Sequence, residues 1–287
     1  MALEIHVLDL GDVELESSFL VHARECGKTY RVPTFGYLIL GGEAPVLVDT
    51  GYRNTQIMER LGMRGIQTDE QRLESQLAKH GLKFADIKYV LHTHMHIDHG
   101  GGDDLFPMTT TVGLNRREME CAVSGLMGEQ YPAEDIKHLI DRLHTRKSLR
   151  LFDTDLTGSE EIIPGVVCTW AGAHTDGSMV VLVETAEGVA GICGDVIYDF
   201  VDQVIEPHHD VSGYVVLDAE PTPTGNHVGS MRSEIAAIKK LLNTCAFICP
   251  THDRPAKIQL GAVVGRMHDS IPGPVSQVSV KRNWMRL

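Results

Sequence analysis

The stretch that decides the fold is Thr93-His94-Met95-His96-Ile97-Asp98-His99-Gly100-Gly101-Gly102. It brings three imidazoles and one carboxylate together, and both groups are common metal ligands. In an extended backbone His94 and His96 point to the same side, while Asp98 and His99 fall in the turn that ends the strand. The glycines that follow allow the backbone to turn tightly beside an ion. The stretch therefore predicts a metal-binding loop.

Short runs rich in β-branched and apolar residues lead into this loop and recur after it, and they predict strands. Polar segments with helical spacing of apolar residues lie between them. Strands and helices alternate without an internal repeat or a linker, which favours one mixed α/β domain over residues 1–287. The predicted strands are 4–8, 37–40, 45–49, 86–91, 166–170, 179–184, 189–193 and 246–249, and the helical segments are 68–80, 115–147 and 233–242.

Three further candidate ligands lie where predicted strands end or meet. His174 lies in a turn between two predicted strands, Asp195 follows a third, and His252 follows the last one. One histidine-rich loop cannot complete two metal sites by itself, so these residues are expected to join it. Their common position at strand ends predicts a single metal centre.

Composition excludes several classes of protein. The 26 lysines and arginines against 39 acidic residues give a formal net charge of −13, which repels phosphate backbones. No window approaches the roughly 18 apolar residues of a membrane span, and the first residues lack a signal-peptide pattern. The six cysteines include no C-x-x-C pair, as expected for reduced thiols. We therefore expect a cytoplasmic protein that binds neither nucleic acid nor membrane.

The H-x-H-x-D-H pattern followed by His174, Asp195 and His252 resembles the metallo-β-lactamase-fold hydrolase superfamily. The resemblance spans Asp49 to His252, and it implies a four-layer αββα sandwich with metals at one edge of two packed sheets. Residues 46–51 also resemble the first motif of that family. The aspartate of this motif, here Asp49, orients the metal ligands by hydrogen bonding.

The resemblance also assigns the ligands to two ions. Imidazole with carboxylate suits zinc best, so two Zn²⁺ ions are expected, with iron or manganese left open. The di-iron members of the family carry glutamate in place of His96, and its main antibiotic-hydrolysing class carries cysteine in place of Asp195, so both branches are disfavoured. The implied ligands are His94, His96 and His174 for one ion, Asp98, His99 and His252 for the other, and Asp195 as the bridge.

The reaction expected of such a centre is metal-assisted acyl transfer to water, with a metal-bridging hydroxide as nucleophile. Asp98 would shuttle the proton. Tyr198 lies three residues after Asp195, and a tyrosine at this position resembles the pattern of the N-acyl homoserine lactonase family. In that family the phenol donates a hydrogen bond to the reacting oxygens. Residues 31–39 add weaker support for that family. The sequence thus predicts a dinuclear zinc lactonase that opens a small lactone to a hydroxy acid.

Three alternatives differ from this prediction. A glyoxalase-II-like thioester hydrolase would share all seven ligands, but the chain after His252 is too short for the added helical domain of that family. A nuclease is disfavoured by the acidic charge. A non-catalytic metal-binding or partner-binding module of the same fold stays open, since ligands alone do not establish turnover.

Some residues are not assigned by a motif. His92 precedes the motif and is interpreted as structural, whereas His208, His209 and His227 are interpreted as loop residues that could contact a polar substrate. A homodimer is an expectation from the resemblance alone. The walls of the substrate pocket are expected from residues 18–36, 115–147 and 199–230.

Overall fold

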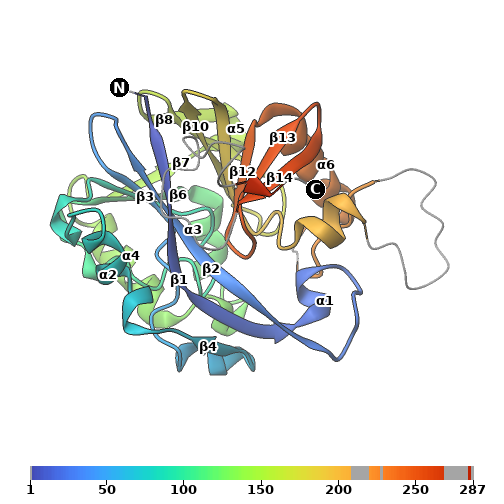
Figure 1. The fold of residues 1–287 in the computed structure, drawn as a ribbon. Coiled ribbons are helices and arrows are strands. Elements are labelled where there is room, and N and C mark those ends of the chain that lie inside the picture. Colours follow the sequence, from blue (N-terminus) through green and yellow to red (C-terminus); the bar gives the residue numbers. More distant parts are fainter. Residues whose placement is uncertain (1, 208–219, 227–228, 268–283, 286–287) are drawn as a thin grey trace.

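The computed structural model describes residues 2–207, 220–226, 229–267 and 284–285. Two β-sheets lie face to face, and helices cover the outer face of each (Figure 1). This arrangement confirms the expected αββα sandwich. The candidate residues His208, His209 and His227 lie outside the described residues.

The first sheet comes from the first half of the chain. Its strands are β1 (Glu4–Glu16), β2 (Thr29–Leu40), β3 (Val46–Val48), β4 (Arg64–Ile66), β5 (Tyr89–Leu91), β6 (Thr111–Asn115) and β7 (Leu149–Phe152). They lie in the order β4-β1-β2-β3-β5-β6-β7, and β3, β5, β6 and β7 run parallel. Their carboxyl ends therefore meet at one edge of the sheet.

The second sheet comes from the second half of the chain. Its strands are β8 (Ser159–Ile163), β9 (Val166–Trp170), β10 (Met179–Thr185), β11 (Gly188–Gly194), β12 (Phe247–Pro250), β13 (Ala256–Gln259), β14 (Ala262–Met267) and β15 (Trp284–Met285). β11 and β12 run parallel, whereas β10 is antiparallel to both β9 and β11. The carboxyl ends of β11 and β12 and the turn between β9 and β10 therefore share one edge.

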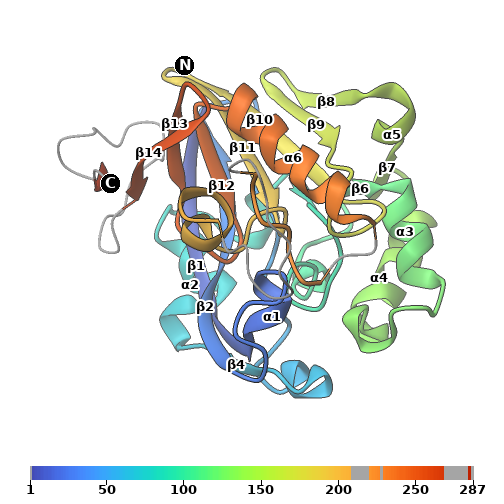
Figure 2. The ribbon, with the colours of Figure 1, turned by 90° about the vertical axis from the view of Figure 1, so that its right-hand side faces the viewer.

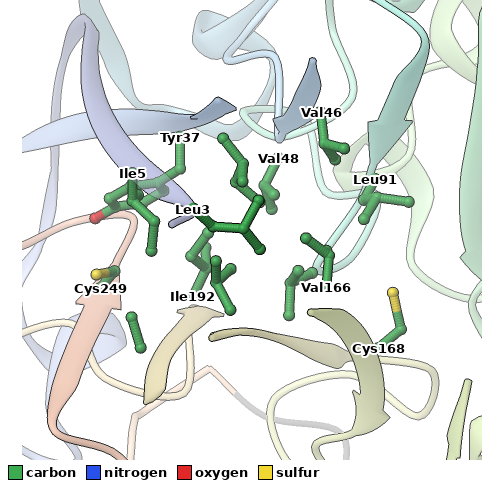
Figure 3. Close-up of a cluster of buried hydrophobic side chains, with 14 of the residues drawn as sticks. Leu3, Ile5, Tyr37, Val46, Val48, Leu91, Val166, Cys168, Ile192 and Cys249 are labelled. Carbon is green, nitrogen blue, oxygen red and sulfur yellow. The ribbon is translucent and has the colours of Figure 1, made fainter. Parts of the chain in front are cut away.

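The core between the sheets follows from the alternation of side chains along each strand. In β3, Val46 and Val48 face the second sheet, and Leu47 faces the helices on the other side. All three are fully buried, as expected for a strand covered on both faces. Figure 3 shows that side chains of both sheets, among them Leu91 and Ile192, meet in this central layer.

The helices supply the two outer layers. Leu77, Met119 and Leu139 lie on helices of the first half of the chain and pack against the first sheet. Ile238 and Leu241 lie on the helix Met231–Thr244 and pack against the second sheet. Figure 2 shows α6 (Met231–Thr244) along the outer face of β10, β11 and β12. The α-helices are α1 (Ser17–Leu20), α2 (Leu73–Ala78), α3 (Arg116–Val123), α4 (Ala133–Leu143), α5 (Thr154–Thr157) and α6 (Met231–Thr244). Short 3-10 helices lie at Ile57–Leu61, Asp69–Gln71, Phe84–Asp86, Asp103–Leu105 and Gly128–Gln130, and a π-helical turn lies at Val201–Ile205.

Two sequence predictions need correction. The helix predicted over 68–80 is divided, because Arg72 has extended backbone between a 3-10 turn and α2. The strand predicted over 86–91 begins only at Tyr89. Because β5 ends at Leu91, His94 and His96 lie in the loop after it rather than on extended strand. Strand pairing does not continue through Thr93, because its backbone N–H donates to the Asp49 side chain at 2.9 Å instead of to a neighbouring strand.

The six cysteines are free thiols, four of them buried, in agreement with the prediction of reduced cysteines. Within the described ranges no helix is both long and apolar enough to cross a membrane.

Candidate metal centre

The loops at one edge of the two sheets bring the predicted ligands together. The loop after β5 lies between the sheets, and the Met179 N–H at the start of β10 donates to the Thr93 carbonyl oxygen at 2.7 Å. The end of β12 is held to the end of β11 by a 3.2 Å hydrogen bond from Thr251 N to Gly194 O. The loop after β5, the β9–β10 turn and the ends of β11 and β12 supply His94, His96, Asp98, His99, His174, Asp195 and His252, which form two neighbouring clusters.

The first histidine group consists of His94, His96 and His174. The Nε2 atom of His94 lies 3.1 Å from Nδ1 of His96 and 3.1 Å from Nε2 of His174, and the last two nitrogens are 3.0 Å apart. Three nitrogens that bind one tetrahedral ion at about 2.0 Å lie about 3.3 Å from one another. The spacing of this group therefore fits a common metal ion.

The second ligand group consists of Asp98, His99 and His252. The Oδ2 atom of Asp98 lies 3.3 Å from Nε2 of His252, and its Oδ1 atom lies 3.7 Å from Nε2 of His99. These two imidazoles and one carboxylate suit zinc.

Asp195 lies between the two groups. Its Oδ1 atom is 3.2 Å from Nε2 of His99 and 3.4 Å from Nε2 of His252. Its Oδ2 atom is 3.4 Å from Nε2 of His174 and 3.6 Å from Nε2 of His94. Each oxygen thus faces one group, which is the geometry required of a bridging carboxylate.

Buried polar atoms without partners support a bound cation at this place. Among the described residues, Nε2 of His99 and Oδ1 of Asp195 are buried and have no hydrogen-bond partner. An unpartnered buried polar atom costs about 1–3 kcal/mol, so a group that satisfies it is expected. The donor set and the spacing of both groups fit two metal ions.

Residues behind the ligands fix which ring nitrogen faces the centre. Oδ2 of Asp49 lies 2.9 Å from Nδ1 of His99, and the Pro33 carbonyl oxygen lies 2.8 Å from Nδ1 of His252. Both contacts leave Nε2 free for an ion. Asp49 and His174 also have positive φ angles of 58° and 64°, an uncommon conformation for residues other than glycine. The position of Asp49 is the one that the family resemblance implies.

The electrostatics of the two groups differ. Burial and the neighbouring imidazoles lower the pKa of His94 and His96 well below the ordinary value, so both are neutral, as metal ligands must be. In the second group burial also disfavours the charged ring, but Asp195 and Asp98 outweigh it and raise the pKa of His252 to about 10. Asp195 likewise raises the pKa of His99. The carboxylates that favour a proton on these two rings would equally favour a metal cation, which displaces those protons when it binds.

Tyr198 lies directly at the centre. Its Oη atom donates to Oδ2 of Asp195 at 2.5 Å, and its ring is stacked on His252 with centroids 4.9 Å apart. The side chain of Gln203 accepts the Tyr198 backbone N–H at 2.7 Å and holds this segment in place. Burial and the charge of Asp195 raise the pKa of the phenol well above its ordinary value, so Tyr198 stays protonated and can donate.

His92 lies behind the centre and outside both groups. Its Nε2 atom is 2.8 Å from Asp103, and although burial opposes protonation, Asp103 and Asp49 raise the pKa of His92 to about 9. A charged imidazole between two carboxylates has a structural role, in agreement with the interpretation of this residue from the sequence.

The segments expected to form pocket walls reach the centre at particular residues. Leu20 and Val21 pack in one cluster with Ile97 of the ligand loop and with Tyr198. The ring of Tyr131 lies 5.1 Å from that of His96. These contacts bring the segments 18–36 and 115–147 to the metal centre.

Two buried glutamates, Glu118 and Glu234, also contact the ligand loops, and no motif predicts them. Glu118 follows Asn115, which caps α3, by three residues, so the sequence alone indicates an ordinary helix start. Glu234 lies in the first turn of α6, where an acidic residue is equally common.

Comparison with known proteins shows that the chain is similar to lactonases. An N-acyl homoserine lactonase of Bacillus thuringiensis is 27% identical over 194 residues, which are 64% of this chain and 71% of that protein. The structure of an N-acyl homoserine lactone hydrolase with the product N-hexanoyl-L-homoserine at its catalytic metal centre matches with a TM-score of 0.63 at 23% identity, over 84% of this chain and 88% of that chain. AidC, a dizinc quorum-quenching lactonase, matches with a TM-score of 0.63 at 17% identity, over 99% and 94% of the two chains.

The family itself follows from a match over most of the chain. The profile of the metallo-beta-lactamase superfamily matches residues 29–252, a range that contains every candidate ligand. This match confirms the resemblance expected from the sequence, and the lactonase relatives agree with the expectation of a metal-dependent hydrolase. The chain belongs to the metallo-beta-lactamase superfamily.

Proposed function

We propose that this metal-dependent hydrolase holds two zinc ions and opens the ring of a small lactone to a hydroxy acid. The observation that carries the proposal is the position of Asp195, which presents one oxygen to each ligand group and accepts a hydrogen bond from Tyr198. The N-acyl homoserine lactonases similar to this chain, one of them dizinc, support both the reaction and the metal.

The ligands divide into two sets with a shared carboxylate. His94, His96 and His174 would hold one ion, and Asp98, His99 and His252 the other. When bound, the two ions would lower the pKa of a water molecule and attract the carbonyl oxygen of an ester. One domain suffices for this chemistry, because both sheets contribute ligands to the same edge.

Asp98 is placed to move the proton. It is 9% exposed, more than any other of the seven candidate ligands, and so lies on the side of the centre nearest to solvent. A carboxylate at this place can accept a proton at an oxygen and release it to the leaving alkoxide.

Tyr198 is placed to bind the oxygens of the reacting ester. Its phenol already donates to Asp195 and remains protonated, so it can donate to a substrate oxygen in the same region. Donors aimed at a developing oxyanion accelerate acyl transfer in many hydrolases. The stacked ring of His252 fixes the direction of this donor.

Proton release by the zinc-loaded protein tests the proposal. The substrates are acyl homoserine lactones, other five- and six-membered lactones, a glutathione thioester, a β-lactam and a phosphodiester. Turnover restricted to lactones supports the proposal. Turnover of the thioester alone contradicts it and favours the glyoxalase-II-like alternative, and metal binding without turnover of any substrate favours a non-catalytic module.

A further inference from the structure

We propose that Glu118 and Glu234 are positioning residues that hold the loops of the first histidine group. Loss of either side chain should then weaken metal binding by His94, His96 and His174 more than binding by the second ligand group. The inference rests on the proposed dinuclear centre and extends it to residues that do not themselves bind metal.

Glu118 connects the two loops that carry the first histidine group. Its side chain is fully buried, and Oε1 accepts the Met95 backbone N–H at 2.8 Å, between His94 and His96. Oε2 accepts the hydroxyl of Thr175, the residue after His174, at 2.6 Å. One carboxylate therefore sets the distance between the loop after β5 and the β9–β10 turn.

The backbone around Glu118 leaves no room for another arrangement. A Cβ atom added at Gly177 would lie 2.0 Å from the Glu118 backbone nitrogen, so the β9–β10 turn packs directly on the start of α3. Tyr131 adds a third hydrogen bond to the carboxylate, from its hydroxyl to Oε1 at 2.9 Å. The position of this carboxylate is fixed from three directions.

Glu234 holds His174 from the opposite side. Its buried side chain accepts the backbone N–H of His174 through Oε1 and the hydroxyl of Thr224 through Oε2, the latter at 3.3 Å. His174 has a φ angle of 64°, and such a conformation persists only where its surroundings enforce it. The hydrogen bond from Glu234 is directed at this uncommon backbone.

The second ligand group depends on different supports. His99 is oriented by Asp49 and His252 by the Pro33 carbonyl oxygen. In the part of the chain that the structure describes, the hydrogen bonds of Glu118 and Glu234 go to residues outside the second group. The two ion positions should therefore respond differently to substitution of these glutamates.

Zinc affinity of the apoprotein, measured by competition with a chromophoric chelator, tests the inference. Glu118→Ala and Glu234→Ala should each weaken one of the two zinc-binding steps about 10- to 100-fold, as is usual for residues that orient metal ligands. Anomalous scattering at the zinc edge, from crystals with limiting zinc, should show the loss at the first histidine group.

Matched variants separate this role from a general effect on folding. Glu118→Gln and Glu234→Gln keep an acceptor oxygen for the backbone N–H and should restore most of the affinity. Glu160→Ala is the control, because Glu160 also accepts a backbone N–H, that of Asp153 at 2.7 Å, but lies on β8 away from the ligands. It should leave both zinc steps unchanged.

A milder substitution covers the case in which the alanine variants fail to fold. Thr175→Val removes a single hydrogen bond to Glu118 and should weaken the same zinc step by a smaller factor. Equal weakening of both steps, or the same loss in Glu160→Ala, overturns the inference. The zinc titrations contain no substrate, so their result does not depend on lactonase activity. A wild-type protein that binds two zinc ions but does not open lactones therefore contradicts the lactonase proposal and not this inference.

Discussion

The phenol oxygen of Tyr198 lies 2.5 Å from Oδ2 of Asp195, the carboxylate oxygen that faces His94 and His174. The ring of the same tyrosine is stacked on His252, which belongs to the second ligand group, with an angle of 6° between the planes. Tyr198 therefore contacts both halves of the candidate centre without being part of either. A donor at this place would lie beside an ester held between the two proposed ions.

Replacing Tyr198 by phenylalanine should slow lactone opening and leave metal binding intact. The ring and its stacking on His252 are kept, and only the hydroxyl is lost. We expect kcat to fall about 100-fold, or about 3 kcal/mol, as for other oxyanion donors. Steady-state ring opening and elemental analysis of zinc measure the two effects.

Tyr52→Phe is the matched control for this variant. It removes another buried hydroxyl, which donates to the Ile66 carbonyl oxygen at 2.9 Å rather than to a candidate ligand. Its kcat should stay close to that of the wild type. An unchanged kcat in Tyr198→Phe would contradict the donor role.

Arg142→Met should strongly destabilise the fold. The Arg142 side chain is completely buried and donates to three carbonyl oxygens, those of Asp103, Phe106 and Thr110, at 2.8 to 2.9 Å. Methionine fills a similar volume but cannot donate to these three acceptors. The free energy of unfolding, measured with urea, should fall by about 3 kcal/mol or more.

The same change at an exposed arginine supplies the comparison. Arg72, whose side chain is 68% exposed, forms an ion pair with the exposed Asp69. Arg72→Met should therefore change the free energy of unfolding by less than about 0.5 kcal/mol. A loss of stability in Arg142→Met no larger than this would show that the buried network contributes little.

Asp135 gives the fold a defined dependence on pH. Burial of this carboxyl, together with Asp103 and Asp104, outweighs its pairing with Arg53 and raises its pKa from 3.8 to about 6. Because the folded pKa exceeds the unfolded one, Asp135 contributes stability that is complete below pH 3.8 and is lost as the pH rises through 6.

Unfolding of the wild type and of Asp135→Asn with urea across this range tests the dependence. Asparagine does not titrate, so the free energy of unfolding of the wild type minus that of the variant should fall by up to roughly 3 kcal/mol between pH 4 and pH 7. A difference that stays constant or rises with pH would rule out a raised pKa at Asp135.

The ligands could be predicted from the sequence because each has a local signature. Asp195 and His252 directly follow strands β11 and β12, whose apolar residues mark them clearly, and parallel pairing then brings both residues to one edge. His174 lies in the turn between two equally clear strands. The position of these residues at strand ends is thus enough to predict that the ligands lie together, even though β5 ends before His94.

The supports behind the ligands could not be predicted, because their contacts are made only in the folded molecule. Glu118 meets Thr175 across 57 residues of sequence, and Glu234 meets His174 across 60. In the sequence both glutamates have the pattern of the first turn of a helix, where acidic side chains usually face solvent near the amino end. Their burial depends on how the helices pack over the ligand loops.

The most direct test of the dinuclear lactonase is the rate of ring opening as zinc is added to the metal-free protein. The substrate is N-hexanoyl homoserine lactone, and the hydroxy acid product is followed by proton release. The account predicts no turnover above the uncatalysed rate without metal, and a rate that reaches its maximum at two zinc ions per chain. Full loading with two zinc ions and no ring opening, or equal activity of the metal-free protein, would contradict it.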